Sequence, residues 1–181
     1  TGGLPDRTCP NIVTSTDTNT DDLAIALQQK LTAIFGKVPH LVICNLRRTK
    51  IDMNRSIPEA TCGNATAAIS WNDYHNYISA ARNTVAQEYG KGLLIDIHGH
   101  GHTIQRAELG YNLSATQLGN TDAYLNGSTP VSGSTIRNLV GTNLTGQSHA
   151  GLIRGAFSLG TYLQASGYPA RSEEHTSELQ S

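Results

Sequence analysis

The stretch Gly92-Leu93-Leu94-Ile95-Asp96-Ile97-His98-Gly99-His100-Gly101-His102 is the most informative part of this chain. Its first half is an almost uninterrupted apolar run. Such a run predicts a strand over 93–97 that is buried on both faces, as in the centre of a parallel or mixed sheet. Its second half places three of the seven histidines at every second position. Alternate side chains of an extended segment project to the same side, and imidazole is the commonest metal ligand and the usual general base near neutral pH. The stretch therefore predicts a strand that ends in a metal or catalytic site.

The segments on either side alternate between helical and extended patterns. Two helices are predicted, over 20–36 and 65–89, because apolar residues recur at three-to-four spacing and each pattern ends at a glycine. The other predicted elements are a short strand over 41–44, a strand over 108–113, turns and loop over 120–134, and a last helix over 151–166. This order predicts an α/β fold, a three-layer α/β/α domain with a mixed, mostly parallel central sheet. His98 would then lie beyond the carboxyl end of a strand, where such sheets bind ligands.

The composition of the 181 residues excludes some classes of protein. A net charge of −1 offers no basic surface for nucleic acid, and no apolar run approaches the roughly 20 residues of a membrane helix. A hydrophobic content of 38% is compatible with one globular domain that buries a core. We therefore expect a partner that is neither nucleic acid nor membrane. These features leave open the oligomeric state and the compartment, cytoplasmic or secreted.

The cysteines give no sign of a metal or redox motif. Cys9, Cys44 and Cys62 are an odd number, and their spacing fits neither kind of site. One disulfide with a leftover thiol and three free thiols are both compatible with the sequence.

A second unusual segment, Arg47 to Arg55, follows the predicted strand over 41–44 and holds four basic residues. An arginine guanidinium is a planar group of donors that binds a carboxylate through two hydrogen bonds, and Asn54 could add a neutral one. A histidine metal site together with an arginine-rich loop predicts hydrolysis of a bond near a carboxylate. The expected partner is a small-molecule or peptide-like carboxylate substrate.

Three motifs in order carry a family resemblance. They are Lys50-Ile51-Asp52-Met53-Asn54-Arg55, Trp71-Asn72-Asp73-Tyr74-His75 and Leu94-Ile95-Asp96-Ile97-His98-Gly99-His100. Together they resemble the N-formylglutamate amidohydrolase family, which is related to the zinc carboxypeptidases. The similarity extends from about Leu4 to Pro169.

This resemblance implies a zinc carboxypeptidase-like fold and a metal-dependent hydrolase of amide bonds. It implies that His98 binds zinc, that Asn54 and Arg55 hold the substrate carboxylate, and that His100, with His102, lines the substrate pocket. In this family an early loop supplies a further His and Glu ligand, which we expect before Thr1. The general-base Glu is expected beyond Pro169.

We also expect the chain to be incomplete at both ends. Residues 171–181 resemble the translation of a sequencing adapter and would be a non-native tail. Residues 1–170 would then be a partial catalytic domain, which we expect to be inactive by itself.

Other interpretations stay open. The chain could be a non-catalytic carboxylate-binding domain of the same fold, or a barrel-type metal hydrolase that uses His98 and His100 as a ligand pair. His98 could also be only a hydrogen-bonded histidine at a strand end, and Arg55 could pair with Asp52. Glu108 could be a carboxylate behind the site or the ion-pair partner of Arg106.

Overall fold

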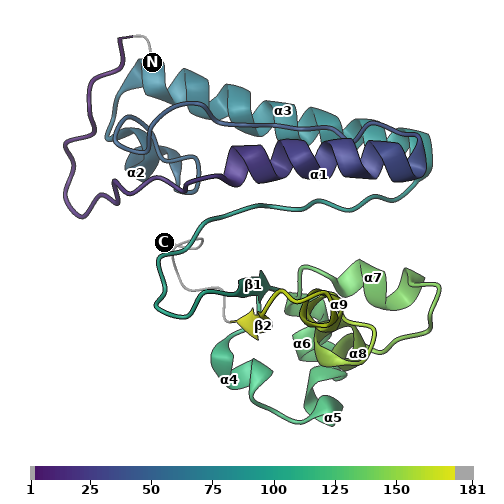
Figure 1. The fold of residues 1–181 in the computed structure, drawn as a ribbon. Coiled ribbons are helices and arrows are strands. Elements are labelled where there is room, and N and C mark those ends of the chain that lie inside the picture. The colour runs from purple at the N-terminus through teal and green to yellow at the C-terminus, as the bar shows by residue number, and fades with distance from the viewer. Residues whose placement is uncertain (1–2, 174–181) are drawn as a thin grey trace. The chain divides into compact units, whose positions relative to one another are not determined.

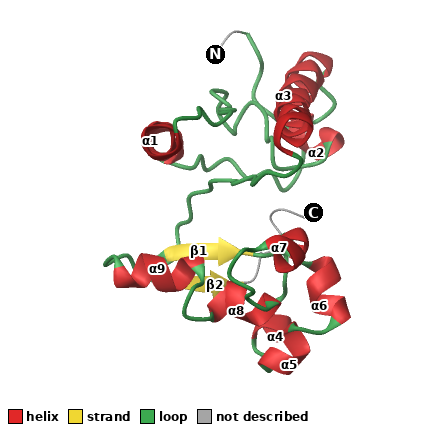
Figure 2. Ribbon diagram, turned by 90° about the vertical axis from the view of Figure 1, so that its right-hand side faces the viewer, coloured by secondary structure: helices red, strands yellow, loops and turns green. Residues whose placement is uncertain are grey.

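The fold is mixed helix and strand, which confirms the prediction in its coarse form. The computed structural model describes residues 3–173. Its contacts divide the chain into two compact units, of which the first ends at Gly101 and the second begins at His102. Figure 2 shows helices and loops in the first unit and both described strands in the second. The described strands form one two-stranded sheet, so the three-layer arrangement stays a prediction, as does a single catalytic domain over 1–170.

Three helices form the first unit: α1 (Thr20–Phe35), α2 (Ile57–Thr61) and α3 (Ala65–Tyr89). The start of α3 is fixed by Asn64, whose side chain accepts a hydrogen bond from the Ala67 amide at 2.9 Å. Both long helices end at a glycine with positive φ, Gly36 at 65° and Gly90 at 72°, a conformation that glycine adopts without strain. The two helices predicted from the sequence are therefore confirmed, α3 at both ends and α1 to within one residue.

The core of the first unit lies at the start of α3. Leu4, Ile51 and Ala67 are buried together there. The partly buried residues Leu46, Met53 and Trp71 pack against them. The packing ties the N-terminal segment and the loop after residue 45 to α3, and it positions the loop that carries the predicted carboxylate-binding residues.

The prediction of two strands in the first unit is wrong. The segments 41–44 and 93–97 belong to no described strand or sheet. Figure 1 shows the chain after α1 and after α3 running back along the helices, and Gln28 of α1 donates to the Pro39 carbonyl at 2.7 Å. Neither segment makes a backbone-to-backbone hydrogen bond with another described residue. A strand exists only through such bonds with a neighbour.

The predicted burial of the apolar run is also wrong. Leu93 is 77% exposed, Leu94 61% and Ile95 52%. No described residue of α1 is buried, so the helix does not cover this run as the helices of a layered α/β sheet would.

The second unit contains the sheet. Strand β1 (Ala107–Gly110) pairs in parallel with β2 (Ala170–Glu173), with Ala107 opposite Ala170. The helices between them are α4 (Ala115–Leu118), α5 (Asp122–Leu125), α6 (Ser128–Gly133), α7 (Arg137–Thr142), α8 (His149–Arg154) and α9 (Leu159–Ala165). The core consists of Tyr111, Leu113, Leu125, Ala150 and Ile153.

Several boundaries in this unit differ from the prediction. The strand predicted over 108–113 is shorter and begins one residue earlier, and the predicted loop over 120–134 contains α5 and α6. The predicted last helix is divided because Gly155 is extended, with ψ 178°, and Ser158 then caps α9 by accepting a hydrogen bond from Thr161. The first residues of the predicted non-native tail, 171–173, belong to β2, and the rest of that prediction lies outside the described residues.

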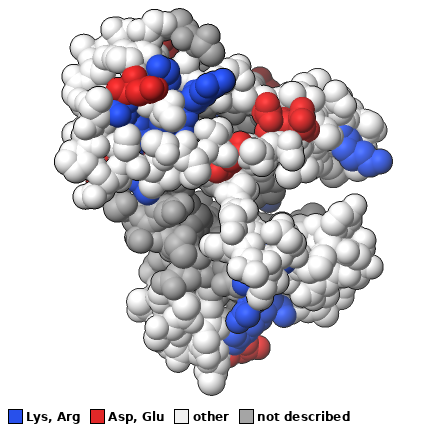
Figure 3. Space-filling model, turned by 60° about the vertical axis from the view of Figure 1, so that its left-hand side comes forward, with Lys and Arg blue, Asp and Glu red and all other residues white. Residues whose placement is uncertain are grey.

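Two further observations concern the surface. In the part of the chain that the structure covers, none of the helices is both long and apolar enough to span a membrane. The face in Figure 3 carries acidic and basic side chains close together, and Lys50 of the first unit pairs with Asp6 at 2.9 Å.

Candidate functional site

The turn formed by Asp52-Met53-Asn54-Arg55 is fixed through its backbone. The Asp52 carboxylate accepts the Asn54 amide at 3.1 Å, and the Asp52 carbonyl accepts the Arg55 amide at 3.3 Å. From α3, the Trp71 indole N–H donates to the Arg55 carbonyl at 3.0 Å, and the His75 ring Nε2 lies 3.1 Å from the Met53 carbonyl. The turn is therefore held from within and by one face of α3.

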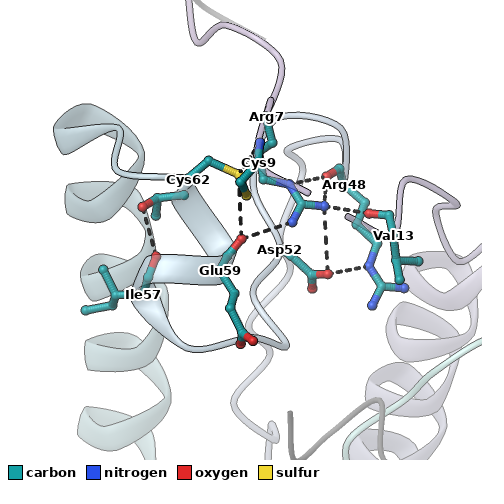
Figure 4. Close-up of a disulfide and its surroundings, with 9 residues drawn as sticks. Arg7, Cys9, Val13, Arg48, Asp52, Ile57, Glu59 and Cys62 are labelled. Carbon is teal, nitrogen blue, oxygen red and sulfur yellow. Dashed lines mark hydrogen bonds and ion pairs between the residues drawn. A yellow bond between two sulfur atoms is a disulfide. The ribbon is translucent and has the colours of Figure 1, made fainter. Parts of the chain in front are cut away.

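Asp52 itself is buried and paired with two arginines. Arg48 Nε donates to its Oδ2 at 2.8 Å, and Arg7 Nη2 lies 3.9 Å from the same oxygen. The Arg7 and Asp52 side chains are only 2% and 3% exposed, and Arg7 also donates to the carbonyls of Arg48 and Glu59, as Figure 4 shows. Burial lowers the pKa of Arg7, and the charge of Asp52 opposes that shift.

A disulfide between Cys9 and Cys62 closes this region, next to Arg7 (Figure 4). Cys44 is a free thiol, so one of the two cysteine states that the sequence allows is realised. Burial raises the pKa of the Cys44 thiol, and the negative charge of Asp52 raises it further.

The side chains of Asn54 and Arg55 take little part in holding the turn. Arg55 donates through Nη1 to the neighbouring Asn54 carbonyl at 3.2 Å. It is not the partner of Asp52, which pairs with Arg7 and Arg48. Within the described residues, the Asn54 side-chain amide and the Arg55 Nε and Nη2 groups make no hydrogen bond. The turn therefore presents a cationic group and a neutral polar group, both partly exposed, on a fixed backbone.

His98 lies between two carboxylates. Its Nδ1 is 3.2 Å from Asp17 Oδ2, and its Nε2 is 3.2 Å from Asp96 Oδ2. The same Asp17 oxygen accepts the Gly99 amide at 3.0 Å. Asp96, through its hydrogen bond, is the main cause of a raised pKa of His98; desolvation opposes the shift, and Asp17 adds to it.

Three neighbouring aromatic residues of α3, Trp71, Tyr74 and His75, lie at the turn. Trp71 and His75 contact the turn. Tyr74 lies between them in sequence and sits edge-on to the His75 ring, with ring centroids 5.3 Å apart. Burial raises the pKa of Tyr74, and Asp96 is near enough for its charge to raise that pKa further. This stretch of α3 therefore contacts the Asn54-Arg55 turn through Trp71 and His75, and the charge of Asp96 acts on Tyr74 beside them.

His100 and His102 belong to another group. His100, His102 and Glu108 are together a set of residues that could hold a metal ion. His102 Nδ1 is 2.9 Å from both Glu108 oxygens. Arg106 Nε lies 3.4 Å from Glu108 Oε1, so the predicted ion pair between them is present. No described group of three possible ligands includes His98.

Asp17 and Asp96 were not predicted as site residues from the sequence. Asp96 could have been identified, because it lies two residues before His98 and alternate residues of an extended chain share a side. Asp17 gives no such signal, because 81 positions separate it from His98.

Comparisons of the chain with protein-family models, with curated proteins and with solved structures find no match. The functional argument therefore depends on the geometry of the residues themselves.

Proposed function

We propose that this chain is part of a zinc-dependent amidohydrolase with a carboxypeptidase-like α/β/α fold. Its substrate would be an N-formyl or other N-acyl acidic amino acid, or a glutamyl amide. The observation that carries the proposal is that the first unit holds two complementary features: a turn, supported by α3, with unengaged Asn54 and Arg55 side chains, and an imidazole held by carboxylates at His98.

Arg55 and Asn54 would bind the substrate carboxylate. The guanidinium can donate two parallel hydrogen bonds through Nε and Nη2, the groups that no described residue engages. Because the backbone of the turn is already fixed by Trp71 and His75, binding a ligand would order only the two side chains. Such preorganisation lowers the entropic cost of binding.

His98 and Asp96 would supply two of the ligands of a zinc ion. Zinc bonds to imidazole nitrogen and carboxylate oxygen are about 2.0–2.2 Å long, which at a tetrahedral angle places two ligand atoms about 3.4 Å apart. The distance of 3.2 Å from His98 Nε2 to Asp96 Oδ2 is close to this value. Asp17, on the other ring nitrogen, would then orient the ring, as carboxylates behind ligand histidines do.

A zinc ion bound there would polarise the scissile carbonyl and lower the pKa of its bound water, to about 7 in well-known sites. The chain's own residues would do the positioning. Arg55 would fix one end of the substrate, and Asp17 would fix both the His98 ring and the Gly99 amide. His100 stays a predicted pocket residue in this scheme.

Zinc titration of the metal-free chain tests the metal part of the proposal. The His98→Ala variant should lose the ion that His98 binds, whereas His40→Ala, which replaces an exposed histidine outside both histidine groups, should bind zinc as the wild type does. Arg55→Ala should keep the zinc and bind N-formylglutamate more weakly in calorimetry. Unchanged zinc stoichiometry and affinity in His98→Ala would refute the assignment of this ligand.

A second candidate is a carboxylate-binding domain without a metal. It is favoured by the fact that the Asn54-Arg55 turn is held by Asp52, Trp71 and His75, none of which depends on His98. N-formylglutamate binding that needs Arg55 but is the same with and without zinc would support this candidate. The pairing of His98 and His100 on one ion, as in a barrel-type hydrolase, is less well supported. His98 lies beside Asp17 and Asp96, and the set of possible ligands that includes His100 does not include His98.

A further inference from the structure

The disulfide between Cys9 and Cys62 indicates the kind of compartment in which the chain matures (Figure 4). Disulfides form and persist in oxidising environments such as the secretory pathway, and they are rare in the cytosol, where thiols are kept reduced. In secreted proteins, an asparagine two residues before a serine or threonine is an acceptor for carbohydrate, unless a proline lies between them. Asn64, two residues after Cys62 and two before Thr66, lies in such a sequence.

Five asparagines of the chain stand in an acceptor sequence of this kind, and the structure distinguishes between them. Attachment of a sugar replaces one of the two hydrogens of the side-chain amide nitrogen, Nδ2. A glycosylated chain therefore reaches the same fold only where the fold does not use both of these hydrogens. The side chain must also have space around it. The five are Asn54, Asn64, Asn112, Asn126 and Asn143.

Asn64 meets both conditions. Its Oδ1 accepts the Ala67 amide at 2.9 Å and so caps α3, whereas its Nδ2 donates to no described residue. A sugar on Nδ2 leaves this oxygen in place, so the helix cap is kept. Asn64 is partly exposed, and its neighbours Gly63, Ala65 and Thr66 are exposed. Because the side chain is bonded only to its own helix among the described residues, no other element has to move for the glycan.

The other four asparagines are less well suited. Asn143 Nδ2 donates to three backbone carbonyls, at 3.1, 3.0 and 3.1 Å, which a single remaining N–H would not satisfy. Asn112 Nδ2 donates to the last carbonyl of α6 at 3.0 Å. Asn126 joins the end of α5 to α8, because its oxygen accepts an amide of α8 at 2.9 Å. Asn54 belongs to the turn proposed to bind a carboxylate, which a glycan would cover.

We infer that the chain matures in an oxidising compartment and carries an N-linked glycan at Asn64. In the transfer, Nδ2 bonds to the anomeric carbon of an oligosaccharide that is held on a lipid diphosphate. The bond between that carbon and the phosphate oxygen breaks, Nδ2 loses a proton, and the lipid diphosphate departs. The inference does not depend on the proposed function, in which Asn64 takes no part.

The test is secretion of the full chain from cultured eukaryotic cells behind a cleavable leader, followed by intact-mass measurement and peptide mapping. A peptide N-glycosidase removes the glycan and converts the linked asparagine to aspartate. It should lower the mass of the wild type and leave aspartate at position 64. A digest made without reduction should contain Cys9 linked to Cys62.

Two variants remove the acceptor in different ways. Asn64→Asp keeps an oxygen that caps α3, and Thr66→Ala keeps the asparagine itself. Both should lose the glycan at position 64. Asn83→Gln replaces an exposed asparagine of α3 that is not followed two residues later by serine or threonine, and it should be glycosylated like the wild type.

Three results would overturn the inference. The first is a wild-type chain, secreted or retained in the cell, that is unmodified at Asn64. The second is a glycan at one of the other four asparagines in place of Asn64, which would refute the choice made from the hydrogen bonds. The third is alkylation of both Cys9 and Cys62 before reduction, which would remove the argument for an oxidising compartment.

Discussion

The turn at Asp52 to Arg55 and the segment from His98 to His102 are held in opposite ways. In the turn, hydrogen bonds from Asp52, Trp71 and His75 fix the backbone, while Asn54 and Arg55 keep side-chain donors unengaged. In the histidine segment, the side chains are engaged by carboxylates. Its backbone is also engaged. The Gly99 amide donates to Asp17 and the His102 carbonyl accepts from Gln105, so the main difference lies in the engagement of the functional side chains.

The difference indicates what each region can bind. A fixed turn with a cationic donor group is prepared for an anion, and it needs little reorganisation when a carboxylate arrives. Imidazoles paired with carboxylates are prepared for a cation, because the acidic groups already compensate positive charge beside the ligand nitrogens. The comparison therefore supports the proposal of a carboxylate-binding role for one region and a metal-binding role for the other.

The largest effect is expected from Arg7→Met, which removes the support beneath the turn. Asp52 would keep its charge in a buried position with one fewer arginine, and the carbonyls of Arg48 and Glu59 would lose a donor. Breaking a buried ion pair costs about 3–5 kcal/mol. Denaturant unfolding should show this loss, whereas Arg82→Met, at an exposed position of α3, should unfold like the wild type. Equal stability of the two variants would show that Asp52 does not need Arg7.

The next effect concerns the disulfide of the same region. The double variant Cys9→Ser, Cys62→Ser removes a cross-link that spans 53 positions, which should cost about 2–4 kcal/mol. Thermal unfolding of the non-reduced proteins measures the difference, with Cys44→Ser as the control that removes the free thiol. If the control loses as much stability as the double variant, the cross-link is not what stabilises the turn.

Replacing the two carboxylates beside His98, those of Asp17 and Asp96, should have an intermediate effect. The effect should be on metal affinity alone. Replacing an outer carboxylate that orients a ligand histidine typically weakens metal binding about 10–100-fold. We therefore expect Asp17→Asn to weaken zinc binding in that range and Asp96→Asn, at the proposed ligand, to weaken it more. Asp73→Asn, exposed on α3, is the control. Equal zinc affinity in all three variants and the wild type would contradict the role of both carboxylates.

The smallest effect is a pH dependence of the metal-free protein. Its hydrogen bond to Asp96 raises the pKa of His98 above that of the unfolded chain. A raised pKa contributes stability that is fully present below the unfolded value, about 6.5 for histidine. That stability is lost as the pH rises through the folded value. The NMR titration of the His98 ring should have a higher midpoint in the folded protein than in urea, and His98→Gln should remove this part of the pH dependence. Equal midpoints would contradict the contacts with Asp96 and Asp17.

The sequence predicted the parts of the fold that depend on local signals. Helices α1 and α3 were predicted because their apolar spacing, first residues and terminal glycines all lie within the helix or next to it. The segments 41–44 and 93–97 were predicted as strands from apolar runs alone. A strand also needs a neighbour to complete its hydrogen bonds, and that neighbour is not a local property.

The same distinction applies to the site. The polar side chains of Asn54 and Arg55 and the alternating histidines were visible as motifs. The support of the turn by Trp71 and His75 comes from 16 and 22 positions away, and Asp17 comes from further still. The sequence therefore indicated which residues carry the chemistry but not which partners fix them.

The central claim is that Arg55 and the metal at His98 act on the same ligand. The direct measurement is a double-mutant cycle in calorimetry, with N-formylglutamate added to the zinc-loaded wild type, to Arg55→Ala, to His98→Ala and to the double variant. Loss of the charged hydrogen bonds at Arg55 should raise the Kd about 10- to 100-fold. We predict that the double variant loses less binding free energy than the two single variants lose in sum. The reason is that one ligand contacts both regions. Strictly additive losses, or a wild-type Kd in Arg55→Ala, would contradict the account.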